Sequence, residues 1–155
     1  ANLYGRGDNY SPEYSHVLPG LIRRIYEAKK ANSPEVIVWG SGDPLREFLF
    51  NDDLADGCIL LLNNLDRVLQ LSKNNKLPPI YNIGSGEEVT IRKLAHMLCH
   101  VVGYQGKLSF DESRPDGTPR KLLDSSLMLQ LGWAAHTSLE EGLSLTYADY
   151  VESHA

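Results

Sequence analysis

Short strand-like segments alternate with segments whose apolar residues recur at helical spacing, and this alternation limits the possible folds more than any other feature. Apolar residues recur at helical spacing from residue 17 to about 31 and again from 91 to 102. The segments 35–39, 46–50 and 107–110 are short, apolar and partly β-branched, which predicts strands. Separated strands of this kind favour a small α/β domain. They are too short and too irregularly ordered for a complete doubly wound nucleotide-binding fold.

The rest of the chain completes a prediction of about five helices and four or five strands in one domain, residues 1–155. Asp52 or Asp53 is expected to cap a helix whose apolar face carries Leu54, Cys58, Leu61, Leu62 and Leu65. Further elements are a looser stretch at 66–79, a strand at 80–83, a brief extended piece at 122–124, a short helix from 125 or 126 to 131, and a last helix from 138. Thr90 and the Ser138–Glu141 capping box predict two helix starts, and Gly103 and Gly132 predict two helix ends.

Composition excludes several classes of protein. The net charge of −5 argues against general binding to nucleic acid. No apolar run approaches the roughly 20 residues of a membrane-spanning helix, and no signal peptide is visible. The two cysteines, Cys58 and Cys99, are predicted to be small buried hydrophobes, which fits a reducing cytoplasm. Because the chain does not begin with Met, we expect it to be processed, truncated or a fragment.

The polar stretch at the start of the chain leads to a candidate catalytic residue. Asn2–Tyr10 holds two glycines, two asparagines and an aspartate, which predicts a tight loop. Ser15 and His16 follow where a helix is expected to begin. The positive end of the helix dipole disfavours a protonated imidazole, so His16 is suited to acid/base chemistry near pH 7. The alternative is a polar residue with ordinary partners, or a helix cap.

Four cations on three separate polar segments, Arg24, Arg46, Arg120 and Lys121, would form a clamp for a diphosphate if the fold brought them together. Taken singly, each would be a solvated surface residue. Trp39 ends a strand beside a glycine turn, and either stacks on a ligand or belongs to the core.

Two further segments are candidates for ligand binding. Asp116 lies in a Pro-Asp-Gly turn and either shapes that turn or accepts hydrogen bonds from a ribose. Gly84-Ser85-Gly86 lacks the third glycine of the dinucleotide fingerprint, so a tight structural turn is favoured there. No spacing of histidine, cysteine and carboxylate residues predicts a metal site.

These residues lie in segments that together resemble the C-terminal portion of the GDP-L-fucose synthase family, within the extended short-chain dehydrogenase/reductases. The resemblance covers almost the whole chain, in order. The matching segments are Asn-Leu-Tyr-Gly at 2–5, Ser-His-Val-Leu-Pro at 15–19, Leu-Ile-Arg-Arg at 21–24, Val-Trp-Gly-Ser-Gly at 38–42, Arg-Glu-Phe-Leu at 46–49, Asp-Asp-Leu-Ala at 52–55, Asn-Ile-Gly-Ser-Gly at 82–86, and the run 115–124 that begins Pro-Asp-Gly-Thr-Pro-Arg-Lys. The segments at 15–19, 38–42 and 115–124 are the most specific to this family.

The resemblance implies a definite activity and fold. The family epimerises two carbons beside the ketone of GDP-4-keto-6-deoxy-D-mannose and then reduces the ketone with NADPH, giving GDP-L-fucose. This chain would be the substrate-binding domain, and residues 1–16 would join it to a Rossmann domain that binds NADP. The family's glycine-rich loop, its Ser-Tyr-Lys reduction residues and its partner cysteine have no counterpart here. Two local departures are Arg6, where proline is common, and Phe50-Asn51, where His-Val is usual.

The resemblance also assigns roles to individual residues. His16 matches the acid/base histidine, and Ala1, Asn2, Leu3 and His16 match positions near the nicotinamide of the cofactor. Arg24, Trp39, Arg46, Asp116 and Lys121 match contacts to the GDP-sugar. Arg23 could face the ligand as well as Arg24.

Two other readings stay open at this stage. A UDP-sugar 4-epimerase or a GDP-mannose dehydratase is the rival enzyme, and a sugar-nucleotide or protein-interaction module is the non-catalytic rival. For the 155 residues alone we expect no reduction, weak GDP-sugar binding, and self-association through an uncovered apolar face. The complete enzyme is expected to be a cytoplasmic homodimer.

Overall fold

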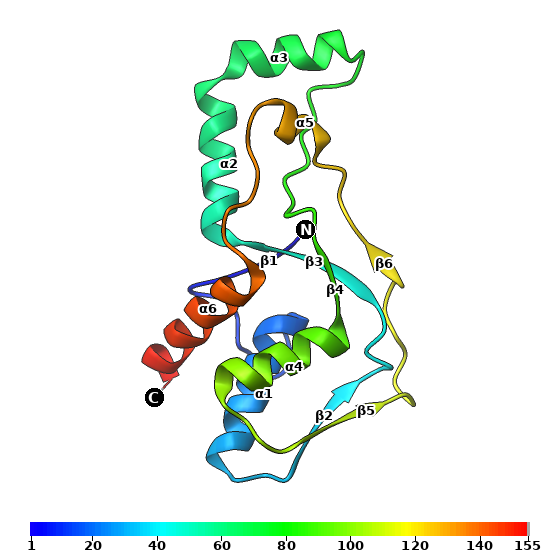
Figure 1. Ribbon diagram of the computed structural model, residues 1–155, viewed down its shortest axis with the longest axis vertical. Helices are drawn as coiled ribbons and strands as arrows, with labels where there is room; N and C mark the ends of the chain where they lie inside the picture. Colours follow the sequence, from blue (N-terminus) through cyan, green and yellow to red (C-terminus); the bar gives the residue numbers. More distant parts are fainter. Residues whose placement is uncertain (155) are drawn as a thin grey trace.

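The computed structural model describes residues 1–154, which fold as a small α/β unit (Figure 1). The helices are α1 (Val17–Lys30), α2 (Asn51–Asn63), α3 (Leu65–Asn74), α4 (Ile91–Val102), α5 (Ser126–Gln130) and α6 (Leu139–His154). The strands are β1 (Asn2–Tyr4), β2 (Glu35–Trp39), β3 (Leu45–Phe50), β4 (Glu88–Thr90), β5 (Lys107–Asp111) and β6 (Arg120–Lys121). None of the described helices is both long and apolar enough to cross a membrane.

Strand β3 organises the larger sheet because it pairs with three other strands. Its first half lies antiparallel to β4 and parallel to β6, and its second half lies parallel to β1. A separate two-stranded sheet joins β2 and β5 in parallel over five residue pairs. The predicted α/β class is confirmed, although the opening stretch expected to be a loop contributes β1.

The main core lies where α1, α4 and α6 pack against the strands, in the lower part of Figure 1. Leu21, Ile22 and Ile25 of α1 meet Leu94 and Leu98 of α4, and all five side chains are fully buried. The apolar spacing of both helices is therefore confirmed as the face that fills the core. The buried residues Leu49, Val68, Met128, Leu131 and Trp133 form a second, smaller core between α2, α3 and α5.

The predicted ends of helices α4 and α6 are also confirmed. Thr90 Oγ1 accepts a hydrogen bond from the Lys93 amide at 3.1 Å, and Gly103 ends α4 with a φ of 72°. Ser138 Oγ accepts from the Glu141 amide at 3.3 Å at the start of α6. These signals worked because a cap acts within one helical turn.

Two local predictions between residues 65 and 83 are wrong. The looser stretch contains α3, whose Val68 is buried in the second core. Residues 80–83 form no strand; Tyr81 instead donates its hydroxyl to the Val68 carbonyl at 2.7 Å, and Asn82 donates its side-chain amide to the Asp124 carbonyl at 3.2 Å. Side-chain hydrogen bonds thus hold this segment in place of a strand ladder.

The prediction that an aspartate caps α2 is wrong as well. Helix α2 begins at Asn51, and the residue before it, Phe50, makes no side-chain capping bond. Asp53 is fully buried and turns its carboxylate toward the chain at 136–137. The residues of the predicted apolar face also differ in burial. Leu62 is 67% exposed, while Leu54 and Leu61 pack against the second core.

The cysteines differ from one another, contrary to the prediction that both are buried. Cys58 is exposed on α2, whereas Cys99 packs against the main core and burial raises its pKa to about 11. A pKa of about 11 leaves roughly one thiolate in a thousand at pH 8.

We therefore expect iodoacetamide at pH 8 to alkylate Cys58 at least about 100-fold faster than Cys99. Mass spectrometry of time points measures both rates, and Cys58→Ser leaves only the slow site. Equal rates in the folded protein would contradict the placement of Cys99, and equal rates in urea are the control.

Candidate functional site

Three of the predicted substrate residues line one cavity of about 200 Å³. Trp39, Arg46 and Asp116 reach it from β2, from β3 and from the loop that precedes β6. Val17, the first residue of α1, forms another part of its wall. The fold thus brings together residues up to 77 positions apart, from Trp39 to Asp116.

Trp39 offers a free aromatic surface at this cavity. Strand β2 alternates exposed and buried residues, and Trp39 falls on the exposed side with 66% of its surface accessible. The Arg114 guanidinium carbon lies 5.2 Å from the centre of the ring system. The alternative of a core tryptophan is therefore wrong, and the ring is available to stack on a planar ligand.

Asp116 is tied to the turn after β2. Its two carboxylate oxygens accept hydrogen bonds from the Ser41 amide at 2.9 Å and the Ser41 hydroxyl at 2.7 Å. Gly40 adopts a φ of +84°, and a Cβ there would stand 2.3 Å from Asp116 Oδ1. Glycine at position 40 is therefore what allows the two loops to meet.

Arg46 holds the same loop from the other side and has a second cation beside it. Its Nη1 donates to the Leu45 carbonyl at 2.7 Å and to the Thr118 carbonyl at 2.5 Å. Lys121 is the residue paired with Arg46 in the register of β3 and β6, and its side chain is exposed. Two positive charges at one rung of a sheet suit a phosphate or diphosphate group.

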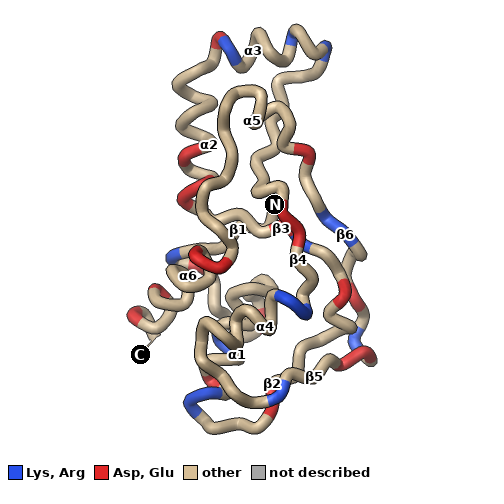
Figure 2. The backbone as a smooth tube through the Cα atoms, in the orientation of Figure 1, with Lys and Arg blue, Asp and Glu red and all other residues tan. Residues whose placement is uncertain are grey.

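The other predicted cations do not join this pair. Arg24 donates to the Ile37 carbonyl at 3.0 Å and does not line the cavity; burial lowers its pKa. Arg120 forms two close contacts with the Glu88 carboxylate at 2.7 and 2.9 Å, so a partner already balances its charge. Arg23 pairs with Glu27 at 3.0 Å. Figure 2 shows the basic residues spread along the fold with acidic residues between them, so the four-cation clamp is not assembled.

His16 lies one residue from the cavity wall. It occupies the N-cap position of α1 without a side-chain capping bond, and its exposed imidazole has no hydrogen-bond partner among residues 1–154. The capping alternative is therefore not what the side chain does. On the preceding loop, burial raises the pKa of Asp8, and the hydrogen bond from the Asn9 amide and the proximity of His16 oppose that shift.

Asn2 and Leu3, which the resemblance places near the nicotinamide, lie on β1. Leu3 is 45% exposed on β1, and Asn2 uses its side-chain amide to donate to the Glu47 carbonyl at 2.9 Å. The Gly84–Gly86 turn is not a phosphate cradle, because the buried Glu47 carboxylate already accepts from the Gly86 amide at 2.8 Å. The structural interpretation of that turn is confirmed.

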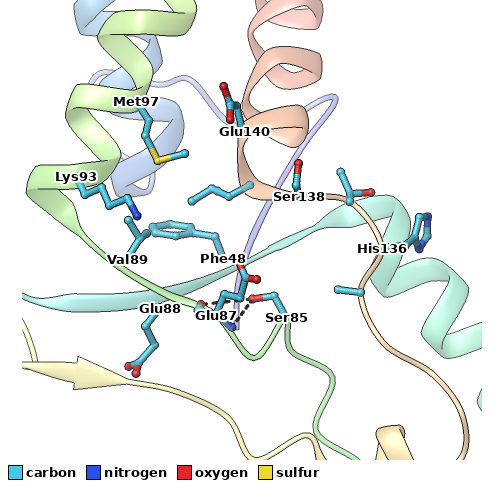
Figure 3. Close-up of a pocket in the computed structure, with 13 residues that line it drawn as sticks. Phe48, Ser85, Glu87, Glu88, Val89, Lys93, Met97, His136, Ser138 and Glu140 are labelled. Atoms are coloured by element: carbon cyan, nitrogen blue, oxygen red, sulfur yellow. Dashed lines mark hydrogen bonds between the residues drawn. The ribbon is translucent and has the colours of Figure 1, made fainter.

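A larger cavity of about 400 Å³ lies elsewhere, between α4, β4 and the start of α6 (Figure 3). Phe48, Val89 and Met97 form its apolar part, and Glu87, Lys93 and Glu140 stand around it. None of the residues predicted for the functional site lines it. Size alone therefore does not select the cavity that the predicted substrate residues share.

Ser41, Thr118 and Arg92 were missed by sequence reasoning although they shape the cavity. Arg92 donates through Nη2 to the Ser41 carbonyl and places its guanidinium carbon 3.9 Å from the centre of the Phe110 ring. The one signal in the sequence was the Gly-Ser-Gly run at 40–42, which indicates a tight turn but not its partners.

Fold and site together define a small α/β domain in which an exposed aromatic ring, an anchored carboxylate and the Arg46 guanidinium line one cavity, with Lys121 at the paired position of the next strand. A family model described as "NAD dependent epimerase/dehydratase family" matches residues 1–84, more than half of the chain. This chain belongs to that family.

Individual relatives and solved structures show which enzymes this chain is similar to. The putative GDP-L-fucose synthase 2 of Arabidopsis thaliana is 53% identical over 98% of this chain and 43% of its own length. Among solved structures, a GDP-6-OMe-4-keto-L-xylo-heptose reductase from C. jejuni superposes with a TM-score of 0.89 at 32% identity, covering 99% of this chain and 52% of the other. A GDP-L-fucose synthetase from Naegleria fowleri, bound to NADP, gives 0.79 at 28% identity, covering 99% and 45%. The resemblance seen in the sequence is confirmed, and the chain spans less than half the length of the curated relative.

Proposed function

We propose that this chain is the GDP-sugar-binding portion of an NADP-dependent 3,5-epimerase/4-reductase that converts GDP-4-keto-6-deoxy-D-mannose to GDP-L-fucose. The observation that carries the proposal is the convergence of Trp39, Arg46 and Asp116 on one cavity beside His16. Similarity to GDP-L-fucose synthases along nearly the whole chain supports the choice of substrate. A UDP-sugar epimerase would share the fold but has no comparable support from close relatives.

In this proposal the cavity holds the nucleotide and His16 acts on the sugar. Trp39 stacks on a planar part of the nucleotide, Asp116 accepts hydrogen bonds from ribose hydroxyls, and Arg46 with Lys121 faces the diphosphate. Arg24 uses Nε for the Gly20 carbonyl and Nη1 for the Ile37 carbonyl, so its Nη2 is the group that would contact the GDP-sugar.

The acid/base step depends on His16, whose exposed imidazole stands at the start of α1. A neutral imidazole has a free nitrogen, which removes the proton from a carbon next to the ketone. The resulting imidazolium can return a proton to the enolate. Inversion needs proton transfer on opposite faces, so a second acid/base group must come from outside the described residues.

Ala1, Asn2, Leu3 and His16 are proposed to flank the nicotinamide end of NADP. When bound, NADPH would supply the hydride that reduces the ketone. The phosphates need a cradle that the described residues lack, so we propose that residues 1–16 join this domain to a Rossmann domain. The exposed Ile59, Leu62, Leu65 and Leu69 on α2 and α3 would then pack against that domain. The proposal includes a homodimeric complete protein and a cytoplasmic location, consistent with two free cysteines.

Nucleotide binding followed through Trp39 tests the proposal. In the complete protein that contains this chain we expect GDP to quench Trp39 emission, and we expect calorimetry to give a Kd at least about tenfold tighter than for UDP. Trp39→Phe should remove the GDP-dependent quenching, while Trp133→Phe, a change in the second core, should keep it. Tighter binding of UDP would favour the rival epimerase.

The 155 residues alone should bind GDP weakly, with a Kd above about 10 µM, because the cleft needs both halves. They should show no turnover of GDP-4-keto-6-deoxy-D-mannose, which the complete protein converts. Submicromolar binding by the isolated chain would contradict the divided site, and GDP binding without turnover by the complete protein would favour a non-catalytic module.

A further inference from the structure

The turn between β2 and β3 is docked onto the start of α4 through its backbone. The Arg92 amide donates to the Gly42 carbonyl at 2.8 Å, and the Ile91 amide donates to the Pro44 carbonyl at 3.2 Å. A Cβ at Gly42 would meet the Phe110 ring at 2.5 Å, so the turn lies directly on β5 as well. These contacts fix the position of the turn, and Ser41 is part of that turn.

The hydroxyl of Ser41 has its hydrogen directed at Asp116. The Ser41 hydroxyl oxygen accepts a hydrogen bond from the Asp43 amide at 3.1 Å, and the hydroxyl group donates to Asp116 Oδ2 at 2.7 Å. Because the amide contact uses a lone pair, the single hydroxyl proton is left for the carboxylate. The Ser41 amide donates to the other oxygen of Asp116, so both oxygens are held by one residue.

Asp116 lies on the exposed loop 112–119, whose backbone Arg46 also holds at the Thr118 carbonyl. Among the described residues, the Asp116 carboxylate itself is hydrogen-bonded to Ser41 alone. A free aspartate there would sample several rotamers and would lose that freedom when it bound a ligand. Each carboxylate oxygen has lone pairs beyond the one that Ser41 uses, so the anchored group can still accept from a ribose. The hydrogen bonds to Ser41 therefore leave Asp116 able to accept from a ligand, and they reduce the conformational entropy that the Asp116 side chain loses when the ligand binds.

We propose that Ser41, held in place by Arg92, is the residue that positions Asp116 for the nucleotide. Arg92 supports it by donating to the Ser41 carbonyl while its guanidinium lies on Phe110. Ser41 acts through Asp116 and is a positioning residue, not a catalytic one. This inference rests on the proposed function, since it assigns Asp116 to a nucleotide.

A double-mutant cycle on the complete protein, with GDP as the probe, tests the coupling. Ser41→Ala removes the hydroxyl and should weaken GDP binding about three- to tenfold, the range expected for one freed side chain. Asp116→Ala should weaken it at least as much. In the double variant Ser41→Ala should add less than about twofold, because its partner is gone. Ser41→Thr, which keeps the hydroxyl, should restore most of the affinity.

The kinetic constants of turnover distinguish a positioning role of Ser41 from a general loss of structure. Ser41→Ala should raise KM for the GDP-sugar by the same factor and leave kcat within about twofold. Ser113→Ala is the matched control, because Ser113 makes a similar hydroxyl bond to Asp111 at 2.6 Å, and Asp111, unlike Asp116, does not line the cavity. It should leave both constants unchanged.

The outcomes distinguish the two proposals. If the unaltered protein binds no GDP, the proposed function fails. If it binds GDP but Ser41→Ala matches the unaltered protein, or the two losses multiply in the double variant, the positioning role fails and the function stands. If Ser41→Ala lowers kcat and the unfolding midpoint together, Ser41 is structural and the proposal is overturned.

Discussion

Replacing His16 by asparagine in the complete protein should lower the rate of proton exchange at the epimerised carbons by about 10²- to 10⁴-fold. Asparagine keeps a polar side chain at the N-cap, where it is well tolerated, but it cannot take up a proton. The fold should survive, because the exposed imidazole makes no hydrogen bond within the described residues.

Deuterium incorporation from D2O into GDP-4-keto-6-deoxy-D-mannose measures this exchange without requiring reduction. GDP affinity should stay within about threefold, since His16 does not line the cavity with Trp39 and Asp116. His96→Asn is the matched control, an exposed histidine on α4 away from that cavity. Exchange at the unaltered rate in His16→Asn would show that another group is the base.

The predictions that succeeded depend on short-range signals. Helices α1 and α4 carry apolar residues at regular helical spacing, and Thr90 and Gly103 mark the ends of α4 within one turn. Helix α3 was missed because its apolar residues alternate with Lys73, Asn74 and other polar side chains, so its content resembles a loop. Only Val68 and Ser72 of that helix are buried, and the second core, not propensity, stabilises it.

Exposure was harder to predict than secondary structure. Cys58 and Leu62 lie on a helix whose apolar composition suggested burial, yet both are exposed in the described chain. Apolar periodicity predicts which face of a helix packs against other residues, but it does not predict whether those residues lie within the same 155 residues.

The candidate site was predictable only in part. Trp39, Arg46 and Asp116 were candidates from their residue types, and the family resemblance gave them roles, but the cavity that they share required the fold. The bond from Ser41 to Asp116 spans 75 positions, and neither residue type at either turn implies it. Arg120 shows the opposite failure: its charge suited a diphosphate, but β4 places Glu88 against it.

Asp53→Ala should destabilise the protein by about 3–5 kcal/mol, the largest stability effect that we expect from a single change. The buried carboxylate accepts from the Thr137 amide at 3.0 Å, the Thr137 hydroxyl at 2.8 Å and the His136 amide at 3.2 Å. Alanine would leave these donors without partners and would free the segment that leads from Trp133 in the second core to α6. Urea unfolding of the complete protein measures the loss.

Asp52→Ala is the matched control for this change, because the neighbouring carboxylate is exposed on the same turn of α2. It should change the free energy of unfolding by less than about 0.5 kcal/mol. Asp53→Asn should fall between the two, since one amide oxygen can still accept while its NH2 group faces donors. A loss below about 1 kcal/mol for Asp53→Ala would mean that water or a shifted loop satisfies residues 136–137. The expected order of destabilisation is Asp53→Ala well above Asp53→Asn, with Asp52→Ala lowest. This order follows only if Asp53 contributes a buried hydrogen-bond acceptor and not a helix cap.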